Sequence, residues 1–232
     1  MWEKHPKSYN NKSQLLMKLY SYVVARDFGF APNPFYGFCT LSSCKPKIRQ
    51  SANKGDWVVG VSSIGRGQDI NPNLVYTMKI TEKLTFQEYW NDPRFLCKRP
   101  VLNGSIKQVY DDNIYHKNSE DKWFQEPSHH TLPNNEPNKK NLKTDTKSDN
   151  VLISQEYYYL GNNKIEIPNY IHHKISITEN SRLGHRVTET CNDIGTFLEW
   201  INSLKLDKVN GDPLHWNTKI PVKDIKRGEN GY

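Results

Sequence analysis

Ionisable side chains that could transfer a proton gather in a few short stretches of the chain. Asp27 follows an aromatic, β-branched run, and the stretch 110–117, YDDNIYHK, places two carboxylates side by side with His116 close behind. A further stretch, 123–130, reads WFQEPSHH. Asp and Asn also dominate ordinary turns, so a structural role stays open for 110–117. Carboxylates and imidazoles are the usual general acids and bases, and the candidate catalytic residues are Asp27, Asp112, His116 and His129.

The sequence predicts no bound metal and no cofactor. Neighbouring histidines usually point apart, so His129 and His130 are not expected to share a metal ion, although one of them is expected at a site. Cys39 and Cys44 form a C-x4-C pair with no second pair downstream, which does not match a structural zinc site. We expect instead a reduced, partly buried thiol near a site.

The charge of the chain favours a polyanionic partner. There are 32 Lys and Arg residues against 25 Asp and Glu, a formal net charge of +7. The basic residues are spread along the chain, so a nucleic-acid partner, a nucleotide and a merely Lys-rich composition all fit. The patterns GxGxxG, GxxxxGK[ST], GxSxG and HExxH are absent, which argues against the common nucleotide-binding, hydrolase and metalloprotease families.

The stretch 23–49, VVARDFGFAPNPFYGFCTLSSCKPKIR, follows neither helical nor strand periodicity. Pro32 and Pro34 fix φ and stiffen the backbone, so nearby rings could meet a ligand with little loss of entropy. A helix beginning at Lys45 or Pro46 would favour an anion at its first turn. Alternatively, the loop packs its aromatic residues onto a sheet. The candidate nucleic-acid contacts here are Arg26, Phe30, Asn33, Phe35, Tyr36, Thr40, Lys45, Lys47 and Arg49.

Other stretches add residues of the types that bind nucleic acids. Aromatic rings stack on bases, amides read base edges, and arginines pair with phosphates. The same aromatic residues could instead only cover a sheet. These further candidate contacts are Trp57, Tyr89, Trp90, Arg94, Asn113, Tyr115, Arg182 and Arg186.

Sequence periodicity predicts an α+β protein with a curved or closed, barrel-like sheet, a few flanking helices and long loops. The segment 97–148 is expected to be mostly loop, with a solvated second half. Strands are predicted over 19–26, 56–63, 74–85 and 150–161, and helices over 45–54, from a Thr85 cap to before Pro93, and over 192–205 with Asn192 or Asp193 as its cap.

The expected organisation is one domain with two polar ends. We expect a flexible extension over 1–16, the domain over 17–206 and a charged tail over 207–232. No run approaches the ~18 to 20 apolar residues of a membrane span. The polar N-terminus lacks the apolar core of a signal peptide, so we expect a cytoplasmic protein with no membrane partner.

Long stretches of the chain resemble a known family. YSYVVARDFGFAPNPFYGFCTLSSCKPKIRQSANKGDWVVG, LVYTMKITEKLTFQEYWNDPRF, KRPVLNGS, DNIYH, SHH and VLISQEYYYLG together look like the nucleotide-modification-associated domain family of the second type. The resemblance runs from about Leu19 to Leu204. It implies a setting of phage or bacterial DNA modification and defence more firmly than it implies a reaction. The strand order and the GDW…YW.DPRF pattern are also similar to the PUA-like EVE and YTH domains, small barrels that grip a flipped modified base.

Three functions follow as hypotheses. The first is a reader that holds an extruded modified base of DNA between aromatic side chains such as Trp57, Tyr89 or Trp90. The second is a DNA glycosylase or base-modifying enzyme in which Asp27, Asp112 or a histidine acts as acid or base. The third is a nucleotide-binding interaction protein that does not contact DNA.

Overall fold

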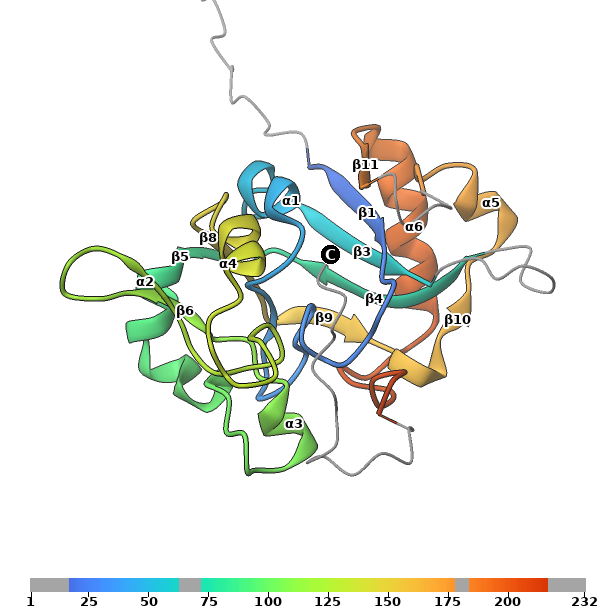
Figure 1. The fold of residues 1–232 in the computed structure, drawn as a ribbon. Helices are drawn as coiled ribbons and strands as arrows, with labels where there is room; N and C mark the ends of the chain where they lie inside the picture. The colour runs from blue at the N-terminus through green and yellow to red at the C-terminus, as the bar shows by residue number, and fades with distance from the viewer. Residues whose placement is uncertain (1–16, 63–71, 178–183, 217–232) are drawn as a thin grey trace, which may run out of the picture.

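The computed structural model describes residues 17–62, 72–177 and 184–216 (Figure 1). The predicted extension 1–16 and the part of the predicted tail beyond residue 216 lie outside the described residues. The described residues form mixed sheets with several helices, which confirms the α+β class in its coarse form.

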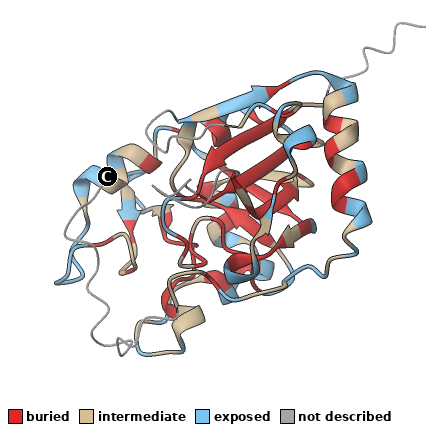
Figure 2. Cartoon of the chain, turned by 90° about the vertical axis from the view of Figure 1, so that its right-hand side faces the viewer, coloured by how far each residue is buried: buried red, intermediate tan, exposed pale blue. Residues whose placement is uncertain are grey.

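The larger sheet has six strands. Its strand β1 runs parallel to β3 and antiparallel to the edge strand β11. Strands β1, β3 and β4 are almost wholly buried (Figure 2), because helices cover one face of the sheet and a second sheet covers the other. In spatial order its strands are β10 (Ile165–Glu166), β4 (Asn73–Lys79), β3 (Trp57–Val61), β1 (Leu19–Val23) and β11 (His185–Thr188), and β9 (Glu156–Tyr159) also pairs with β4.

Strand β1 is buried on both faces, so its sequence shows no alternation of polar and apolar residues. Leu19 and Val23 lie in the cluster that includes Ile194 and Phe197 of helix α6 (Cys191–Ser203). The predicted helix over 192–205 is therefore confirmed, although Thr190 and not Asn192 or Asp193 is its N-cap. Helix α5 (Asn169–His172) packs beside α6, and the 3-10 turn η2 (Gly161–Asn163) follows β9.

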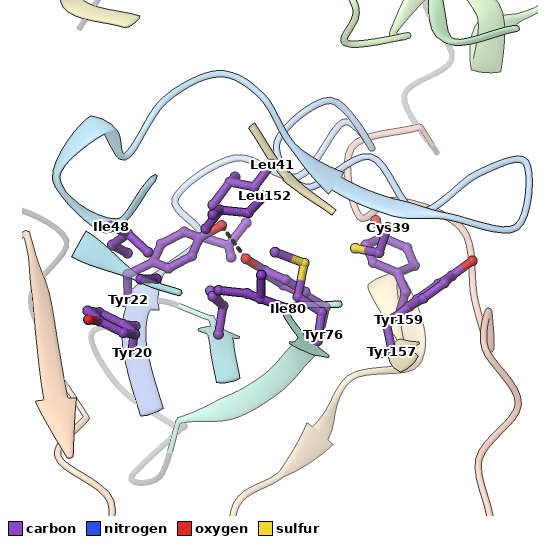
Figure 3. Packing of buried hydrophobic residues seen from close by; sticks show 14 of the residues in the cluster. Tyr20, Tyr22, Cys39, Leu41, Ile48, Tyr76, Ile80, Leu152, Tyr157 and Tyr159 are labelled. Carbon is purple, nitrogen blue, oxygen red and sulfur yellow. Dashed lines mark hydrogen bonds between the residues drawn. The ribbon is translucent and has the colours of Figure 1, made fainter. Parts of the chain in front are cut away.

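The opposite face of β1 packs against a three-stranded sheet and a short helix. Tyr22 of β1 and Tyr76 of β4 lie in one cluster with Leu41, Ile48 and Leu152 (Figure 3). The two tyrosine hydroxyls lie 2.9 Å apart and hydrogen-bond each other, so neither is buried without a partner. The elements on this side are β2 (Cys39–Leu41), β8 (Asn150–Ser154), β5 (Glu82–Thr85) and helix α1 (Pro46–Ser51).

Two predicted long strands each break and change sheets at the same corner. The segment 74–85 divides into β4 and β5, and 150–161 divides into β8 and β9. The two segments stay paired across the break, with Lys79 opposite Glu156 and Glu82 opposite Ile153. The described strands curve at this corner but form no closed barrel, since the larger sheet ends at β10 and β11. The expected PUA-like or EVE-like barrel is thus not confirmed.

Most of the segment 97–148 lies outside regular helices and strands, as expected, although it contains two short helices and a two-stranded sheet. Just before this segment, helix α2 begins with the expected capping box of Thr85 and Glu88, and it packs against β6. The second half, expected to be solvated, contains a helix whose last residue, Asp145, is only 2% exposed. Helix α2 (Phe86–Asn91) and the 3-10 helix η1 (Pro93–Lys98) lead into this segment, and its own elements are α3 (Ile106–Val109), β6 (Tyr115–Lys117), β7 (Trp123–Gln125) and α4 (Lys139–Asp145).

Two glycines should respond in opposite ways to the same substitution. A Cβ on Gly60 of β3 would lie 2.2 Å from the ring of Tyr76, and the hydrogen bond between the Tyr76 and Tyr22 hydroxyls holds this ring in place. Nothing lies within 4 Å of a Cβ on Gly195 of α6. We expect Gly60→Ala to lower the free energy of unfolding by about 1–3 kcal/mol through overpacking. Gly195→Ala should raise it by roughly 0.5–1 kcal/mol because alanine favours a helix. Urea unfolding of both variants measures this, and two changes of the same sign would contradict it.

Candidate active site

Three residues from distant parts of the chain meet beside helix α1. Cys44 lies just after β2, His130 follows β7, and Asp145 ends α4. The Cys44 Sγ lies 3.8 Å from the His130 Nε2, and the His130 Nδ1 lies 2.9 Å from an Asp145 carboxylate oxygen. A thiol, an imidazole and an orienting carboxylate in this order are the parts of a cysteine nucleophile with its base.

Asp145 positions both of the other residues. One carboxylate oxygen accepts the backbone N–H of Cys44 at 2.7 Å, and the other accepts the Tyr115 hydroxyl at 2.7 Å as well as the His130 ring. Burial alone would raise the pKa of Asp145, but the hydrogen bond and charge of His130 bring it below its usual value. The carboxylate is therefore ionised at neutral pH and fixes the orientation of the imidazole.

His130 is buried against the ring of Phe30, with the two ring centroids 4.5 Å apart. Burial would lower the pKa of His130, yet the negative charges of Cys44 and Asp145 and their hydrogen bonds raise it to about 10. The imidazole is thus charged at neutral pH. An imidazolium beside a cysteine stabilises the thiolate, which is the nucleophilic form.

Arg49 holds the nucleophile and the carboxylate segment together from inside the protein. Its side chain is fully buried, and its Nε donates to the Cys44 carbonyl at 3.0 Å. Its Nη2 donates to the Asp145 carbonyl at 2.5 Å, and its Nη1 to the carbonyls of Ser148 and Asn150. Arg49 was predicted to contact nucleic acid, but in this structure its guanidinium is used within the protein.

The backbone at the nucleophile is also unusual. Cys44 has φ of 55° and Lys45 has φ of 40°, so two consecutive residues with side chains are left-handed. Such conformations cost of order 1–3 kcal/mol each and gather at functional sites. Cys39, the other cysteine of the pair, lies in the apolar core between the sheets, so the two thiols have separate environments. Among the described residues, no group of His, Cys, Asp or Glu is arranged to hold a metal ion.

Asp112 lies in a second buried polar cluster. Its carboxylate accepts the hydroxyls of Thr40 and Tyr89, each at 2.8 Å. The buried Lys98 ammonium donates to the side-chain and backbone oxygens of Asn33. Burial raises the pKa of Asp112 and lowers that of Lys98, while their opposite charges act against both shifts. The predicted residues Asn33, Thr40, Tyr89 and Asp112 are thus brought together, but away from the surface.

Asp111 connects this cluster to the surface through Tyr36. The Tyr36 hydroxyl donates to the Asp111 carboxylate at 3.0 Å, and the Tyr36 side chain is 36% exposed. Burial raises the pKa of Asp111 to about 7, against the hydrogen bond from Tyr36 and the positive charge of Lys98. Asn113, next along the chain, is fully buried and donates to the carbonyls of Tyr89 and Phe95.

Asp27 ties the C-terminal segment to the sheet. Its carboxylate accepts the Tyr159 hydroxyl at 2.6 Å and the backbone N–H groups of Gly29 and Leu214 at 3.2 Å. Its backbone pairs with His215, and the Trp216 indole stacks on Phe35. Burial raises the pKa of Asp27. The predicted catalytic role thus falls on a carboxylate that three donors of the protein already occupy.

The other predicted histidines lie in different surroundings. The His116 ring lies 2.9 Å from a Glu126 carboxylate oxygen and stacks on the ring of Trp90. The Arg99 guanidinium also lies over the Trp90 ring, 3.6 Å from the ring centroid. Two groups this close to one ring must cover its two faces, so a base could not stack on Trp90 without displacing one. His129 instead lies among aromatic rings, packed against Phe28, Phe30 and Tyr110.

The remaining predicted contacts divide between surface and interior. Arg94 is exposed and pairs with Asp92 and Glu82. Trp57, Phe30, Phe35 and Tyr115 are buried, and Lys45 is half-buried. Arg182 lies outside the described residues. The other exposed residues of the predicted set are Arg26, Lys47 and Arg186.

A family model for nucleotide modification associated domain 2 matches residues 16–220. The chain belongs to this family. The resemblance that the sequence motifs indicate is therefore confirmed, and membership associates the protein with nucleic-acid modification. No curated protein and no solved structure matches the chain. No helix of the described residues is long and apolar enough to span a membrane.

The triad of Cys44, His130 and Asp145 is only partly predictable from the sequence. A partly buried thiol near a site is expected from the cysteine pattern, and one site histidine is expected from the pair at 129–130. Asp145 has no such signal, because it lies in a Lys- and Asn-rich stretch that resembles a solvated loop. Lys98 was also missed, since charged residues are rarely fully buried, whereas Asp111 was noted only as part of the carboxylate pair of 110–117.

The positively charged His130 ring beside the Cys44 thiol predicts a reactive Cys44. At pH 7, iodoacetamide should alkylate Cys44 roughly tenfold faster than Cys97 or Cys191, which are more exposed but have no imidazolium beside them. Asp145→Asn should remove most of this advantage. Peptide mass spectrometry over time measures each thiol separately, and equal rates at the three cysteines would contradict the expectation.

The buried Asp111 predicts a pH dependence of stability. Between the ordinary Asp pKa of about 4 and the native value of about 7, the folded protein binds a proton that the unfolded chain does not. The free energy of unfolding should therefore fall as pH rises through this window, by at most about 1.4 kcal/mol per unit. Asp111→Asn should flatten this slope, whereas the exposed control Asp121→Asn should not. Urea unfolding at several pH values measures it, and an unchanged slope in Asp111→Asn would refute it.

Proposed function

We propose that this protein is a cysteine-dependent enzyme that transfers or removes an acyl group in the modification of a nucleobase. The observation that carries the proposal is the chain of contacts from the Cys44 thiol through His130 to Asp145. Family membership supports a nucleic-acid modification setting. Enzyme chemistry is favoured over simple recognition because a reader needs no oriented thiol and imidazole.

The reaction follows from the charges of the site. The Cys44 thiolate attacks the carbonyl carbon of an ester, amide or thioester, and a carbon–sulfur bond forms as the bond to the leaving group breaks. His130 gives its Nε2 proton to the departing oxygen, nitrogen or sulfur. Water or an amine of a base then loses a proton to His130 and attacks the acyl-enzyme, which restores the thiolate. No electron is gained or lost overall.

The modified base is expected to bind beside His130. Phe28 and His129 are half-buried rings that pack with Tyr110, and Phe30 connects them to the imidazole. An extruded base of DNA would stack on this aromatic group, next to the thiol. Thiols stay reduced in the cytoplasm, so a nucleophilic thiol supports a cytoplasmic location for the enzyme.

A glycosylase that uses Asp27 or Asp112 has less support. Such an enzyme needs a carboxylate that can reach the sugar or the base. Both carboxylates are buried and accept hydrogen bonds from tyrosine hydroxyls of the protein. Either would have to lose these partners first, and leaving the buried donors without partners costs about 1–3 kcal/mol for each.

Covalent trapping tests the proposed reaction. On incubation with p-nitrophenyl acetate, intact-mass spectrometry should show one acetyl group, and peptide mapping should place it on Cys44. Cys44→Ala should abolish this adduct, and Asp145→Asn should slow its formation by at least about tenfold, because the imidazole loses its orienting partner.

Two comparisons make this test specific. Cys97→Ala removes an exposed thiol and should leave the acetylation rate unchanged. An oligonucleotide with an acylated base amine should be deacylated by the wild type and not by Cys44→Ala. Acetylation spread over several thiols, or full deacylation by Cys44→Ala, would refute a nucleophilic Cys44.

A further inference from the structure

A group of three basic side chains adjoins the thiol. Lys45 directly follows Cys44, Lys47 lies in α1, and His185 begins β11. The Lys45 ammonium lies 4.6 Å from the ring centroid of Tyr22, and Tyr22 is the β1 residue directly opposite His185. Residues opposite each other on paired strands share a face of the sheet. The side chains of Lys45 and His185 therefore lie on the same face of β1 as Tyr22.

This basic group has no acidic partner among the described residues. The surface ion pairs of the described residues use other lysines, such as Lys18 with Glu189 and Lys79 with Glu156. Burial lowers the pKa of Lys45, and the negative charge that opposes this shift is that of Cys44. Burial, then the charges of Lys47 and Lys45, lower the pKa of His185.

Such an arrangement is unfavourable until an anion joins it. A half-buried ammonium with no carboxylate beside it loses hydration, and neighbouring positive charges repel each other. Folded proteins usually place a carboxylate at such a position. Here the ammonium is instead adjacent to the proposed nucleophile, where a substrate would bring its own charge.

We propose that Lys45, Lys47 and His185 bind a phosphate of the substrate, and this inference rests on the proposed function of Cys44. Ammonium groups serve as point charges for phosphate oxygens, and a neutral imidazole adds a hydrogen-bond donor. The ligand is the phosphate of a nucleotide unit, either free or within a strand. Its binding at Lys45 sets the attached nucleoside close to the thiol, because Lys45 and Cys44 are consecutive.

Protection of Cys44 from alkylation tests the phosphate site in the full chain. The rate at which iodoacetamide modifies Cys44 is measured with thymidine, with thymidine 5′-monophosphate and with a single-stranded ten-nucleotide oligothymidylate. The two phosphate-bearing probes should slow alkylation, and thymidine at the same concentration should not. Protection should weaken as salt is added, since the contact is electrostatic.

A charge-matched pair of variants separates this site from general attraction. Lys45→Gln with Lys47→Gln should raise the half-protecting concentration of the phosphate-bearing probes at least tenfold. Lys54→Gln with Lys205→Gln removes the same charge from exposed positions and should change it less than twofold. For each variant, the alkylation rate of Cys44 with probe is divided by the rate without probe. A change in the reactivity of the thiol itself therefore cancels from the ratio. If the double variant does not fold, Lys47→Gln alone should still weaken protection, because its side chain is exposed.

The possible results distinguish the type of ligand, and they separate the phosphate site from the proposed reaction. Stronger protection by the monophosphate identifies a free nucleotide as the ligand, and stronger protection by the oligothymidylate identifies a strand; both support the site. Equal protection by thymidine, or full protection in the Lys45, Lys47 double variant, overturns it. Failure of the acetylation test with intact phosphate protection would remove the proposed reaction alone. Acetylation of Cys44 without phosphate protection would remove the phosphate site alone.

Discussion

The buried guanidinium of Arg49 is the interaction on which the site depends. It donates to the carbonyls of Cys44 and Asp145, two residues separated by about a hundred positions in the chain. Nothing covalent holds these two segments together, and their carbonyls would otherwise be buried without donors. A planar group with five N–H donors can satisfy several carbonyls at fixed angles, which a lysine cannot. The distance between the Cys44 thiol and the His130 imidazole therefore depends on Arg49, a residue that is buried inside the protein.

The segment 97–148 is attached to the domain at both of its ends by buried polar groups. At its start, Lys98 and the Asp111–Asp112 pair bond to Asn33 and Thr40 of the loop around β2. Near its end, Asp145 bonds to the backbone of Cys44. Between these attachments the segment presents His130 to the thiol. Both attachments use opposite charges that compensate each other, so the buried charges are tolerated.

The sequence predicts the regular elements better than their arrangement. The capping box at Thr85 and the apolar face of α6 are local patterns, and both predict the observed helices. The corner where β4 becomes β5 has no local signal, because Ile80 and Thr81 continue a strand-like composition. The parallel pairing of β1 with β3 depends on contacts far apart in the chain. Periodicity within one segment cannot specify such contacts.

In the candidate site, too, residue types are predictable from the sequence and their spatial arrangement is not. Cys44 and the histidine pair stand out by residue type, but only the fold selects His130 over His129 by directing it to the thiol. Asp145 and Lys98 lie in stretches whose polar composition predicts exposure, and their burial depends on partners supplied by other segments. The predicted acid–base residues Asp27 and Asp112 are indeed surrounded by hydrogen-bond donors, yet those donors belong to the protein itself.

The long separation in sequence between Cys44 and His130 affects the chain while it is being made. Cys44 emerges from the ribosome well before His130, and it lies on a strained turn that the completed fold stabilises. Until the later segment has docked, the thiol lacks the imidazolium and remains an ordinary, weakly reactive cysteine. The contact between thiol and imidazole is therefore absent from nascent or locally unfolded chains. It forms only together with the finished structure.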